Sequence, residues 1–438
     1  MRLEISNFAK IGYADLEFNG ITVIAGENNT GKTTVGKVLY SLFNSFCDLE
    51  GQIDRRKADE IHRLCTMYLK RYMVMNTRVS DIEKNSTRII TRAYDEIYAA
   101  IADEICNIYP EEFSIEILTD VIYNALEEND LVRDKQFERV VEELYDKLIS
   151  VVKIDRWKVA LEIVFQFFDV NFASQIQSLK YEDDKAQITL TIKDNPIKIE
   201  MTGDSIEIDG NINVMHEAYF LDDPFVIDKM RTVYLGKSGN NIRPRDFLVS
   251  KLKSCENQID NVFDTVYAKE KIKEIMHIIN DVVPGEISSK SGKWTLSSTY
   301  FEKPIDFYNL SAGLKSFVII KMLLEKGILK EKDVLILDEP EIHLHPEWQL
   351  KYAEIIVLLQ KLFDLNIVVT THSRDFFEAI DLYSQKYLIS EKCNYYLAKQ
   401  SDGISTFEDV TNDTTKIYSQ LIKPSRLLDK LRFELEDE

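Results

Sequence analysis

The chain has 438 residues, of which 54 are Lys or Arg and 74 are Asp or Glu, giving a formal net charge of −20 at pH 7. This length is typical of two or three domains, and the 45% hydrophobic content excludes a globally disordered protein. The acidity excludes a protein that coats nucleic acid with a basic surface, so any nucleic-acid contact must be local.

The opening residues predict short strands followed by a helix. Residues 1–24 alternate apolar and polar side chains around turn-prone pairs, which predicts two or three strands. A glycine-rich turn follows, and then a helix over about 32–46. Residues 54–172 have the pattern of long amphipathic helices, but no heptad repeat is sustained, so a long coiled-coil arm is not expected.

Strands return in the middle of the chain. Period-two alternation over 186–199 and 205–214 predicts a β-meander. A second helical stretch is expected over about 245–283, and the final third alternates strands and helices. The last residues, 434–438, form an acidic tail that we expect to be frayed.

Charge is unevenly distributed along the first helical region. Residues 54–92 contain ten basic and five acidic side chains, a net of +5, whereas residues 93–150 contain four basic and sixteen acidic, a net of −12. One interpretation is two solvated helix faces of opposite sign that partly pair with each other. The other is a basic face over 54–92 that binds a phosphate backbone or an acidic partner.

The segment 217–228, EAYFLDDPFVID, also has two interpretations. It is either a turn that joins the meander to the next element, or a site where Asp222 and Asp223 bind basic residues of a partner or a second metal ion.

The sequence predicts a cytoplasmic protein that makes no membrane contact. The most apolar windows, 159–168 and 317–324, are too short or too interrupted by charge for the ~20 residues of a membrane span. The N-terminus alternates like a strand and has no signal-peptide pattern. Five scattered cysteines without a Cys-x-x-Cys pair favour free thiols in a reducing compartment.

The most specific motif is GENNTGKT, which fits G-x-x-x-x-G-K-[ST] and lies between an apolar strand and a helix. Gly31 lets successive backbone N–H groups face phosphates, and the helix that begins at Lys32 adds its positive end. Lys32 would reach the β- and γ-phosphates, and the Thr33 hydroxyl would complete a Mg²⁺ shell. The predicted nucleotide-binding residues are Gly26, Glu27, Asn28, Asn29, Thr30, Gly31, Lys32, Thr33, Thr34 and the distant Asp338.

A second motif, DVLILDEPEIHLHP over 333–346, places carboxylates after a buried strand. Asp338 is expected to share Mg²⁺ with Thr33, and Glu339 to polarise the attacking water. His343 and His345 allow a metal site by their spacing, but a short loop after the acidic pair explains them better.

Two weaker signals accompany these motifs. NLSAGLKS over 309–316 offers a hydroxyl and bare N–H groups at a helix start, where an anion could bind. IVVTTHS over 367–373 is a buried strand that ends at His372, whose imidazole could hydrogen-bond the γ-phosphate at the same sheet edge.

In this order, the motifs resemble those of the ATP-binding-cassette ATPases of the SMC, Rad50, RecF and OLD group. GENNTGKT resembles their Walker A motif, NLSAGLKS their signature, VLILDEP their Walker B, EIHLHP their D-loop and TTHS their switch histidine. The resemblance implies an α/β fold, an ABC-type P-loop ATPase head split by a large helical insertion and a small β-meander. The expected parts are a split head over 1–46 and 300–425, a helical insertion over 47–180, the meander with a helical connection over 181–299, and the acidic tail over 426–438.

The resemblance also implies a mechanism. ATP and Mg²⁺ would be the cofactors, Glu339, Lys32 and His372 the catalytic residues, and Thr33 and Asp338 the metal ligands. Two heads would enclose ATP in a homodimer or higher homo-oligomer, so that the signature residues of one head act on the nucleotide of the other. These signature residues are Ser311, Ala312 and Gly313.

Three departures from the family pattern narrow the choice of branch within the family. The signature has LSAGLK in place of LSGGQ, and no glutamine of a Q-loop can be placed among Gln166, Gln175 and Gln177. Too few residues follow His372 for the fused nuclease domain of the OLD branch.

The chain therefore looks like the ATPase subunits of bacterial anti-phage systems such as Septu, PARIS and retron-associated systems. A separate nuclease or toxin would be its effector, and DNA contact is possible through 54–92. The alternative is a RecF-like or SMC-like DNA repair or clamp ATPase that binds DNA directly, for which DNA-stimulated hydrolysis with strong salt dependence is expected. A transporter subunit is a third and less favoured possibility.

Overall fold

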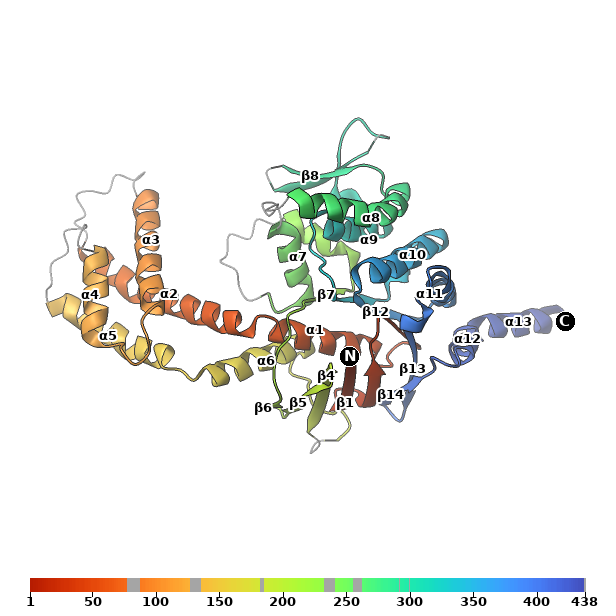
Figure 1. Ribbon diagram of the computed structural model, residues 1–438, viewed down its shortest axis with the longest axis horizontal. Helices are drawn as coiled ribbons and strands as arrows, with labels where there is room; N and C mark the ends of the chain where they lie inside the picture. Colours follow the sequence, from red (N-terminus) through yellow and green to blue (C-terminus); the bar gives the residue numbers. More distant parts are fainter. Residues whose placement is uncertain are drawn as a thin grey trace. The chain divides into compact units, whose positions relative to one another are not determined.

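The computed structural model describes residues 1–76, 87–126, 135–181, 185–231, 241–254, 262–290, 292–298 and 300–436. The chain divides into two compact units (Figure 1). The head unit consists of Met1–Cys47 and Val164–Glu438, and the helical unit of Asp48–Ile163. The predicted α/β class, with a head split by a helical insertion, is confirmed. The predicted domain boundaries stay a prediction.

An eleven-stranded sheet forms the centre of the head unit, in the order β6-β5-β4-β1-β2-β14-β13-β3-β12-β11-β7. Its strands are β1 (Arg2–Phe8), β2 (Ile11–Glu17), β3 (Ile21–Gly26), β4 (Ala186–Ile192), β5 (Asn195–Met201), β6 (Ile206–Asp209), β7 (Ala218–Leu221), β11 (Val334–Asp338), β12 (Asn366–Thr371), β13 (Cys393–Ser401) and β14 (Ile404–Asp409). The five consecutive strands β13, β3, β12, β11 and β7 are parallel to one another, and β3 is buried along its whole length. Such a run, apolar on both faces, is typical of a parallel strand covered by helices.

Helices cover this sheet, and a small second sheet, β10-β9-β8, lies apart from it. The helices are α1 (Lys32–Phe46), α7 (Pro244–Ser254), α8 (Val262–Val282), α9 (Ala312–Glu325), α10 (Pro346–Phe363), α11 (Arg374–Lys386), α12 (Thr415–Leu421) and α13 (Lys423–Glu436), with short 3-10 turns η3 (Pro224–Arg231), η4 (Phe307–Asn309), η5 (Pro340–His343) and η6 (Ser390–Lys392). The second sheet contains β8 (Glu286–Lys290), β9 (Lys293–Ser297) and β10 (Ile305–Asp306).

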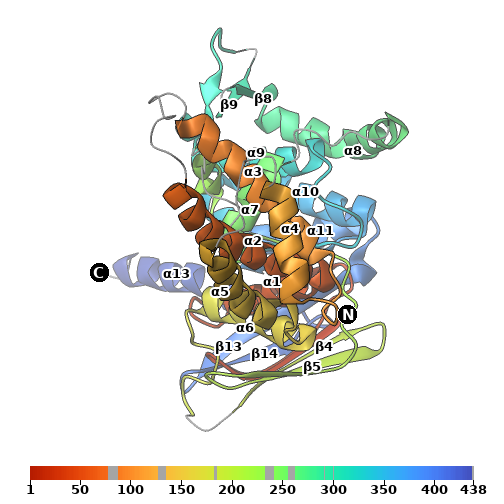
Figure 2. The same ribbon diagram turned by 90° about the vertical axis from the view of Figure 1, so that its left-hand side faces the viewer.

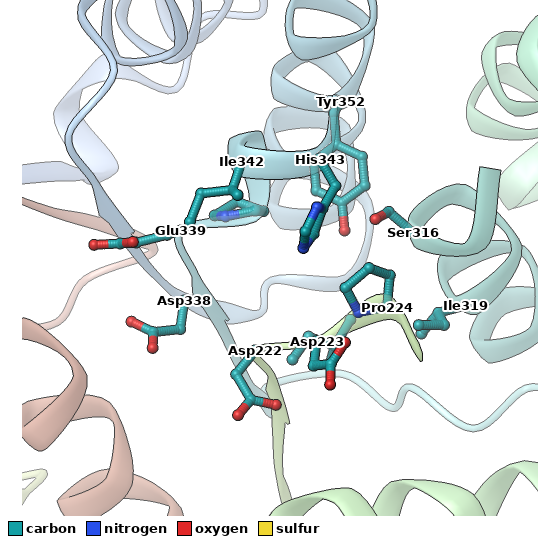
Figure 3. A pocket seen from close by; sticks show the side chains of 12 residues that line it. Asp222, Asp223, Pro224, Ser316, Ile319, Asp338, Glu339, Ile342, His343 and Tyr352 are labelled. Atoms are coloured by element: carbon teal, nitrogen blue, oxygen red, sulfur yellow. The ribbon is translucent and has the colours of Figure 1, made fainter. Parts of the chain in front are cut away.

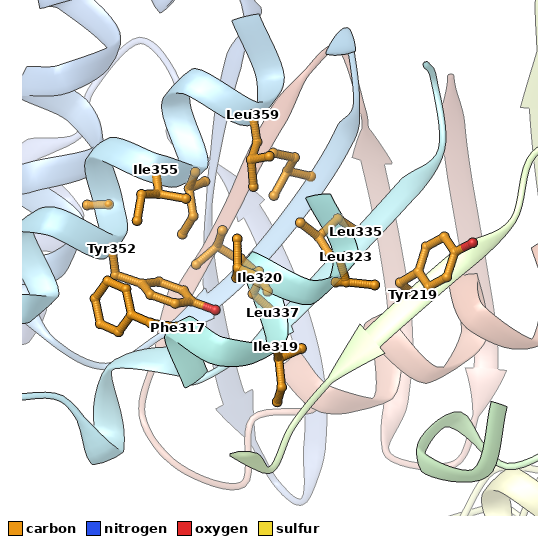
Figure 4. Close-up of a cluster of buried hydrophobic side chains, with 14 of the residues drawn as sticks. Tyr219, Phe317, Ile319, Ile320, Leu323, Leu335, Leu337, Tyr352, Ile355 and Leu359 are labelled. Atoms are coloured by element: carbon orange, nitrogen blue, oxygen red, sulfur yellow. The ribbon is translucent and has the colours of Figure 1, made fainter. Parts of the chain in front are cut away.

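The main core lies between α9, α10 and β11 (Figure 4). Phe317 and Ile320 of α9 and Tyr352 of α10 pack there with Leu337 of β11, all at most 2% exposed. The apolar window 317–324 is therefore a buried core helix. Among the described residues, no helix is long and apolar enough to cross a membrane.

The helical unit contains α2 (Leu49–Asn76), α3 (Thr87–Cys106), α4 (Ile115–Leu126), α5 (Lys135–Val152) and the first half of α6 (Arg156–Phe172), which ends in the head unit (Figure 2). Its core is almost wholly apolar and includes Leu69, Ile101, Ile122 and Leu144, each fully buried. Amphipathic spacing on each helix supplies these side chains, as the sequence predicts.

Most elements expected from the sequence are present, with four differences. The meander is β4, β5 and β6, but β4 pairs with β1, so these strands extend the large sheet. The small sheet β8–β10 was not expected. In the segment 217–228, residues Ala218–Leu221 form the parallel strand β7 and not a turn, whereas binding of a partner or a metal ion by Asp222 and Asp223 stays a prediction. The expected fraying is wrong for Glu434–Glu436, which close helix α13, whereas 437–438 lie outside the described residues.

Candidate functional site

Three parallel strands bring the predicted site residues to one edge of the sheet. β12 lies between β3 and β11, and its Thr370 is in register with Asp338 while Thr371 is in register with Ala25. The carboxyl ends of these strands therefore meet. The loop after β3 and the first turn of α1 contain Gly26, Glu27, Asn28, Asn29, Thr30, Gly31, Lys32, Thr33 and Thr34.

Glycine is needed at one position of this loop and at one position of the helix that follows it. Gly31 has a φ of 81° and precedes the first turn of α1, a left-handed conformation that favours glycine. The hydroxyl of Thr30 donates to the carbonyl of Glu27 at 2.8 Å and closes the loop. Gly36 lets α1 approach the sheet, because a Cβ there would lie 2.9 Å from the ring of Phe220.

Lys32 is held over the loop with little freedom. Its side chain is 4% exposed, and its ammonium donates to the carbonyls of Gly26 at 3.0 Å and Glu27 at 2.8 Å. The same Nζ lies 3.6 Å from Oε1 of Glu339. The predicted phosphate-binding lysine and the predicted water-activating carboxylate are therefore neighbours, although they are far apart in the sequence.

Asp338 is the acceptor for two hydroxyls. Thr33 donates to its carboxylate at 2.9 and 3.1 Å, and Thr370 donates at 2.6 Å. Burial raises the pKa of Asp338, while these two hydrogen bonds act in the opposite direction. The Thr33 hydroxyl and the Asp338 carboxylate are oxygen ligands of the type that Mg²⁺ prefers, and one or two protein oxygens are its usual share beside phosphate and water.

Glu339 lies between Lys32 and His372 and contacts both. Its backbone is left-handed, with φ 50° and ψ 51°, and its N–H donates to the carbonyl and the hydroxyl of Thr370 at 3.1 and 3.0 Å. A left-handed non-glycine residue is costly and is often found at functional sites. Its Oε1 lies 3.5 Å from Nδ1 of His372, as well as beside Lys32. The three predicted catalytic residues are thus in contact.

A buried carboxylate, Glu341, supports the histidine and was not predicted as a site residue. Its Oε1 accepts hydrogen bonds from the hydroxyl of Thr371 at 2.5 Å and from the N–H of His372 at 3.1 Å. Burial raises its pKa. Its place in the run DEPEIH, three residues after Asp338, was the available sequence signal.

Asp222 and Asp223 lie at the same sheet edge, beside Asp338 (Figure 3). They follow β7, which is the parallel neighbour of β11. The guanidinium of Arg245 pairs with both, at 2.9 Å to each. A small cavity of about 40 Å³ lies between these residues and Glu339. Asp222 and Asp223 were candidates from the sequence, but their place beside Asp338 and their pairing with Arg245 could not be predicted, because β7 is only four residues long.

The signature residues lie elsewhere in the head unit. Ser311 caps α9, accepting from the N–H of Leu314 at 3.4 Å, and its side chain is exposed. Gly313 packs closely, since a Cβ there would be 3.0 Å from the carbonyl of His343. In the described part of the chain, no hydrogen bond or ion pair joins Ser311, Ala312 or Gly313 to the P-loop.

Other candidates from the sequence are not gathered at this edge. Gln166 lies in α6, and Gln175 and Gln177 lie in the loop after it. In the basic stretch, Arg55 pairs with Asp48 at 2.9 Å, and Arg63 pairs with Glu60 through bonds of 2.6 and 2.7 Å. Residues 77–86 of this stretch lie outside the described residues, so its role stays a prediction.

His343 and His345 belong to a turn and a helix start. His343 ends η5, and Nδ1 of His345 accepts from the N–H of Glu347 at 3.4 Å at the start of α10. This agrees with the structural interpretation of the two histidines.

The chain is similar to proteins of known family and structure. A family model described as an AAA ATPase domain matches residues 1–377. Among solved structures, an SMC head bound to the C-terminal winged-helix domain of ScpA aligns with 10% identity and a TM-score of 0.44, covering 93% of this chain and 97% of that chain. The SMC head domain from Thermotoga maritima has 10% identity, coverage of 93% and 98%, and a TM-score of 0.38.

A third structure, an Smc head from Pyrococcus furiosus with an extended coiled coil and a bound ScpA domain, has 10% identity, 98% coverage of both chains and a TM-score of 0.40. The family match carries the assignment, because it spans most of the chain and includes the P-loop, Asp338, Glu339 and His372. The chain belongs to the family of AAA ATPase domains.

Proposed function

We propose that the head unit binds ATP with Mg²⁺ and hydrolyses it to ADP and phosphate. The observation that carries the proposal is the contact between Lys32, Glu339 and His372 at the P-loop, beside the Thr33–Asp338 pair. Thr33 and Asp338 would hold Mg²⁺, which when bound neutralises phosphate charge and orients the phosphates.

The chain's own groups have distinct tasks in this proposal. The Lys32 ammonium exchanges its carbonyl partners, Gly26 and Glu27, for phosphate oxygens and stabilises the charge that develops on them. Oε1 of Glu339 orients a water molecule and accepts its proton during attack. The imidazole of His372, which lies beside Glu339, would hydrogen-bond the γ-phosphate that the water attacks. Glu341 accepts a hydrogen bond from the backbone N–H of His372 and so holds that residue in place.

Two separate lysine substitutions in α1 test the proposal. Lys32→Ala should abolish detectable ATP hydrolysis and weaken ATP binding at least about tenfold, because the main cation at the loop is removed. Lys37→Ala, on the same helix, is the matched control and should leave both within about twofold. Normal hydrolysis by folded Lys32→Ala protein would refute the site.

We propose further that two heads share each ATP, with Ser311, Ala312 and Gly313 acting on the nucleotide of the other head. Ser311 is exposed, and among the described residues no hydrogen bond joins it to the P-loop of its own chain, which supports this arrangement. Mixing Lys32→Ala and Ser311→Arg subunits, each inactive alone, should restore part of the activity at one composite site. A mixture without activity, from variants that bind to each other, would count against action in trans.

In the cell, we propose that this ATPase controls a separate nuclease or toxin in a bacterial anti-phage system. The motif order supports this role, and so does the presence of a helical insertion. Phage protection should require the neighbouring effector gene, and Lys32→Ala should remove protection. Copurification with that gene's product is the direct test.

The alternative, a DNA repair or clamp ATPase, predicts a different pattern. DNA would then stimulate hydrolysis with a strong salt dependence. Reversing the charges of Arg55, Arg56, Lys70 and Arg71 should weaken DNA binding in that case. Protection without an effector gene, together with such DNA dependence, would favour the clamp.

A further inference from the structure

A second cavity lies at the opposite edge of the central sheet from the P-loop. It has a volume of about 600 Å³, within the range of about 300–1,000 Å³ that is typical of small-molecule sites. Gly20, Lys332 and Asn366 line it: Gly20 and Lys332 lie just before β3 and β11, and Asn366 is the first residue of β12. The β4–β5 turn and the loop 211–216 form the other side. All these segments belong to the head unit.

The cavity collects positive charge. Lys193, Lys332 and His216 all line it, and within the described part of the chain neither lysine has an ion-pair or side-chain hydrogen-bond partner. The pKa of His216 is lowered, first by burial and then by the charges of Lys332 and Lys193. The charges of the two lysines therefore act on the same point in the cavity, the imidazole of His216.

The nearby carboxylates are already engaged. Asp364, which lines the cavity, pairs with Lys392 at 2.9 Å. Asp333 is almost fully buried and accepts from the N–H groups of Lys330 at 2.9 Å and Glu217 at 3.2 Å. Its Oδ1 is also 3.7 Å from Nδ1 of His216. An anion in the cavity would thus meet two unpaired ammonium groups.

The remaining lining combines amides with apolar walls. Five asparagines line the cavity, and an asparagine amide has both a donor and an acceptor, which is the pairing that a nucleobase edge requires; they are Asn19, Asn195, Asn211, Asn213 and Asn366. Phe43, near the end of α1, is among the apolar residues of the wall. Both lysines have left-handed backbones, with φ of 47° for Lys193 and 66° for Lys332, a conformation uncommon for lysine.

We propose that this cavity binds a nucleoside monophosphate, with the phosphate at Lys193 and Lys332 and the base among the asparagine amides. The site is separate from the P-loop, so the proposal goes beyond the ATPase function and does not depend on it. An anion of this class matches the cavity in size, charge and hydrogen-bonding capacity.

The test measures binding of AMP, GMP, CMP and UMP, one at a time, to full-length Lys32→Ala protein by calorimetry, with inorganic pyrophosphate as a probe for phosphate alone. At least one nucleotide should bind with a Kd below about 1 mM. The double variant Lys193→Asn/Lys332→Asn, in the same background, should weaken that binding at least about tenfold. Asparagine removes the charge but tolerates the left-handed backbone. Lys198→Gln, an exposed lysine of β5 outside the cavity, should leave binding unchanged.

Hydrogen exchange locates the site independently. The bound nucleotide should protect 192–195 and 211–216, and the P-loop should not be protected. Absence of binding by all four nucleotides would overturn the proposal. So would equal binding by the double variant, protection confined to 26–34, or pyrophosphate binding as tightly as the nucleotides.

Discussion

The two units bury different kinds of side chain. Every described Ser, Thr, Asn, Gln or charged residue that is buried belongs to the head unit, among them Lys32, Lys315, Lys321 and Glu341. The described core of the helical unit consists of aliphatic and aromatic residues, alanine and cysteine. Its ion pairs, such as the one between Arg156 and Asp54, lie at the surface.

This difference indicates that the head unit holds the reactive groups, whereas the core of the helical unit serves only stability. A buried charge is costly unless partners hold it in place, so groups such as Lys32 are restricted to a few geometries. A purely apolar helical core needs only volume and pattern, and it leaves the outer faces of the unit available for other contacts. The head unit should therefore respond to single polar changes in activity, and the helical unit to core changes in stability.

The largest expected effect is in the head unit. Asp338→Asn removes a carboxylate that accepts from Thr33 and Thr370, and it should lower Mg²⁺-dependent ATP hydrolysis at least about a hundredfold. The matched control is Asp146→Asn, an exposed carboxylate of the helical unit, which should leave turnover unchanged. Steady-state phosphate release measures both. Equal effects would remove the contrast between the units.

A cavity in the core of the helical unit should lower stability and leave ATP binding unchanged. Leu144→Ala removes a fully buried side chain and should lower the unfolding free energy of this unit by about 2–5 kcal/mol. Unfolding in urea, monitored by hydrogen exchange in each unit separately, measures the loss of unfolding free energy. Glu142→Ala, exposed on the same helix, is the control. ATP affinity should stay within about twofold in both variants, and a parallel loss would show that the units are not separate.

A smaller effect is expected at the buried lysine of α9. Lys321 donates to Asn280 at 2.8 Å and to the carbonyls of Gly285 at 2.5 Å and Val283 at 3.3 Å. Lys321→Met leaves these acceptors unpaired and should destabilise the head unit by about 1–3 kcal/mol. Lys158→Met, at an exposed position of the helical unit, should change stability by less than about 0.5 kcal/mol. Denaturant midpoints decide between these outcomes.

The motifs of contiguous residues could be predicted from the sequence, and the residues that support them could not. The loop 26–34 is a contiguous motif, and the spacing of its residues is enough to predict its backbone conformation. Thr370 and Glu341 acquire their partners only when β12 and β11 pair in register. The Asp222–Arg245 pair depends likewise on β7, a strand too short to recognise beside a long loop.

The same reasoning explains the fold. α1 and β3 follow from strong local periodicity, whereas the joining of β4 to β1 requires residues about 185 positions apart to find one another. The helical tail was mispredicted because charge dominates its composition. Its apolar residues are nevertheless spaced along one helix, and Leu428, Leu431 and Leu435 follow a heptad-like interval.

A pH dependence of stability, with opposite signs in the two units, is also expected. Burial raises the pKa of Asp333 to about 6, above the usual value of about 3.9. The stabilisation from its protonation is complete below about pH 4 and is lost as pH rises to about 6, by an amount of about 1–3 kcal/mol. Asp333→Asn should remove this part of the slope in urea unfolding between pH 4 and 7.

The carboxylate of Glu60 in the helical unit has the reverse sign. A hydrogen bond from Arg63 lowers its pKa, so its contribution is present above the unfolded pKa and is lost as pH falls. Glu60→Gln should therefore flatten the slope slightly on the acidic side. An unchanged slope in both variants would contradict these assignments.

The most direct test of the site is ATP turnover and ATP binding measured together in Glu339→Gln. Glu339 contacts Lys32 and His372, so its loss should remove water activation but preserve the loop that holds the nucleotide. Turnover should fall at least about a hundredfold while ATP affinity stays within a few-fold. Turnover close to that of the unmodified protein, with the same affinity, would contradict the assignment of Glu339 as the residue that activates water.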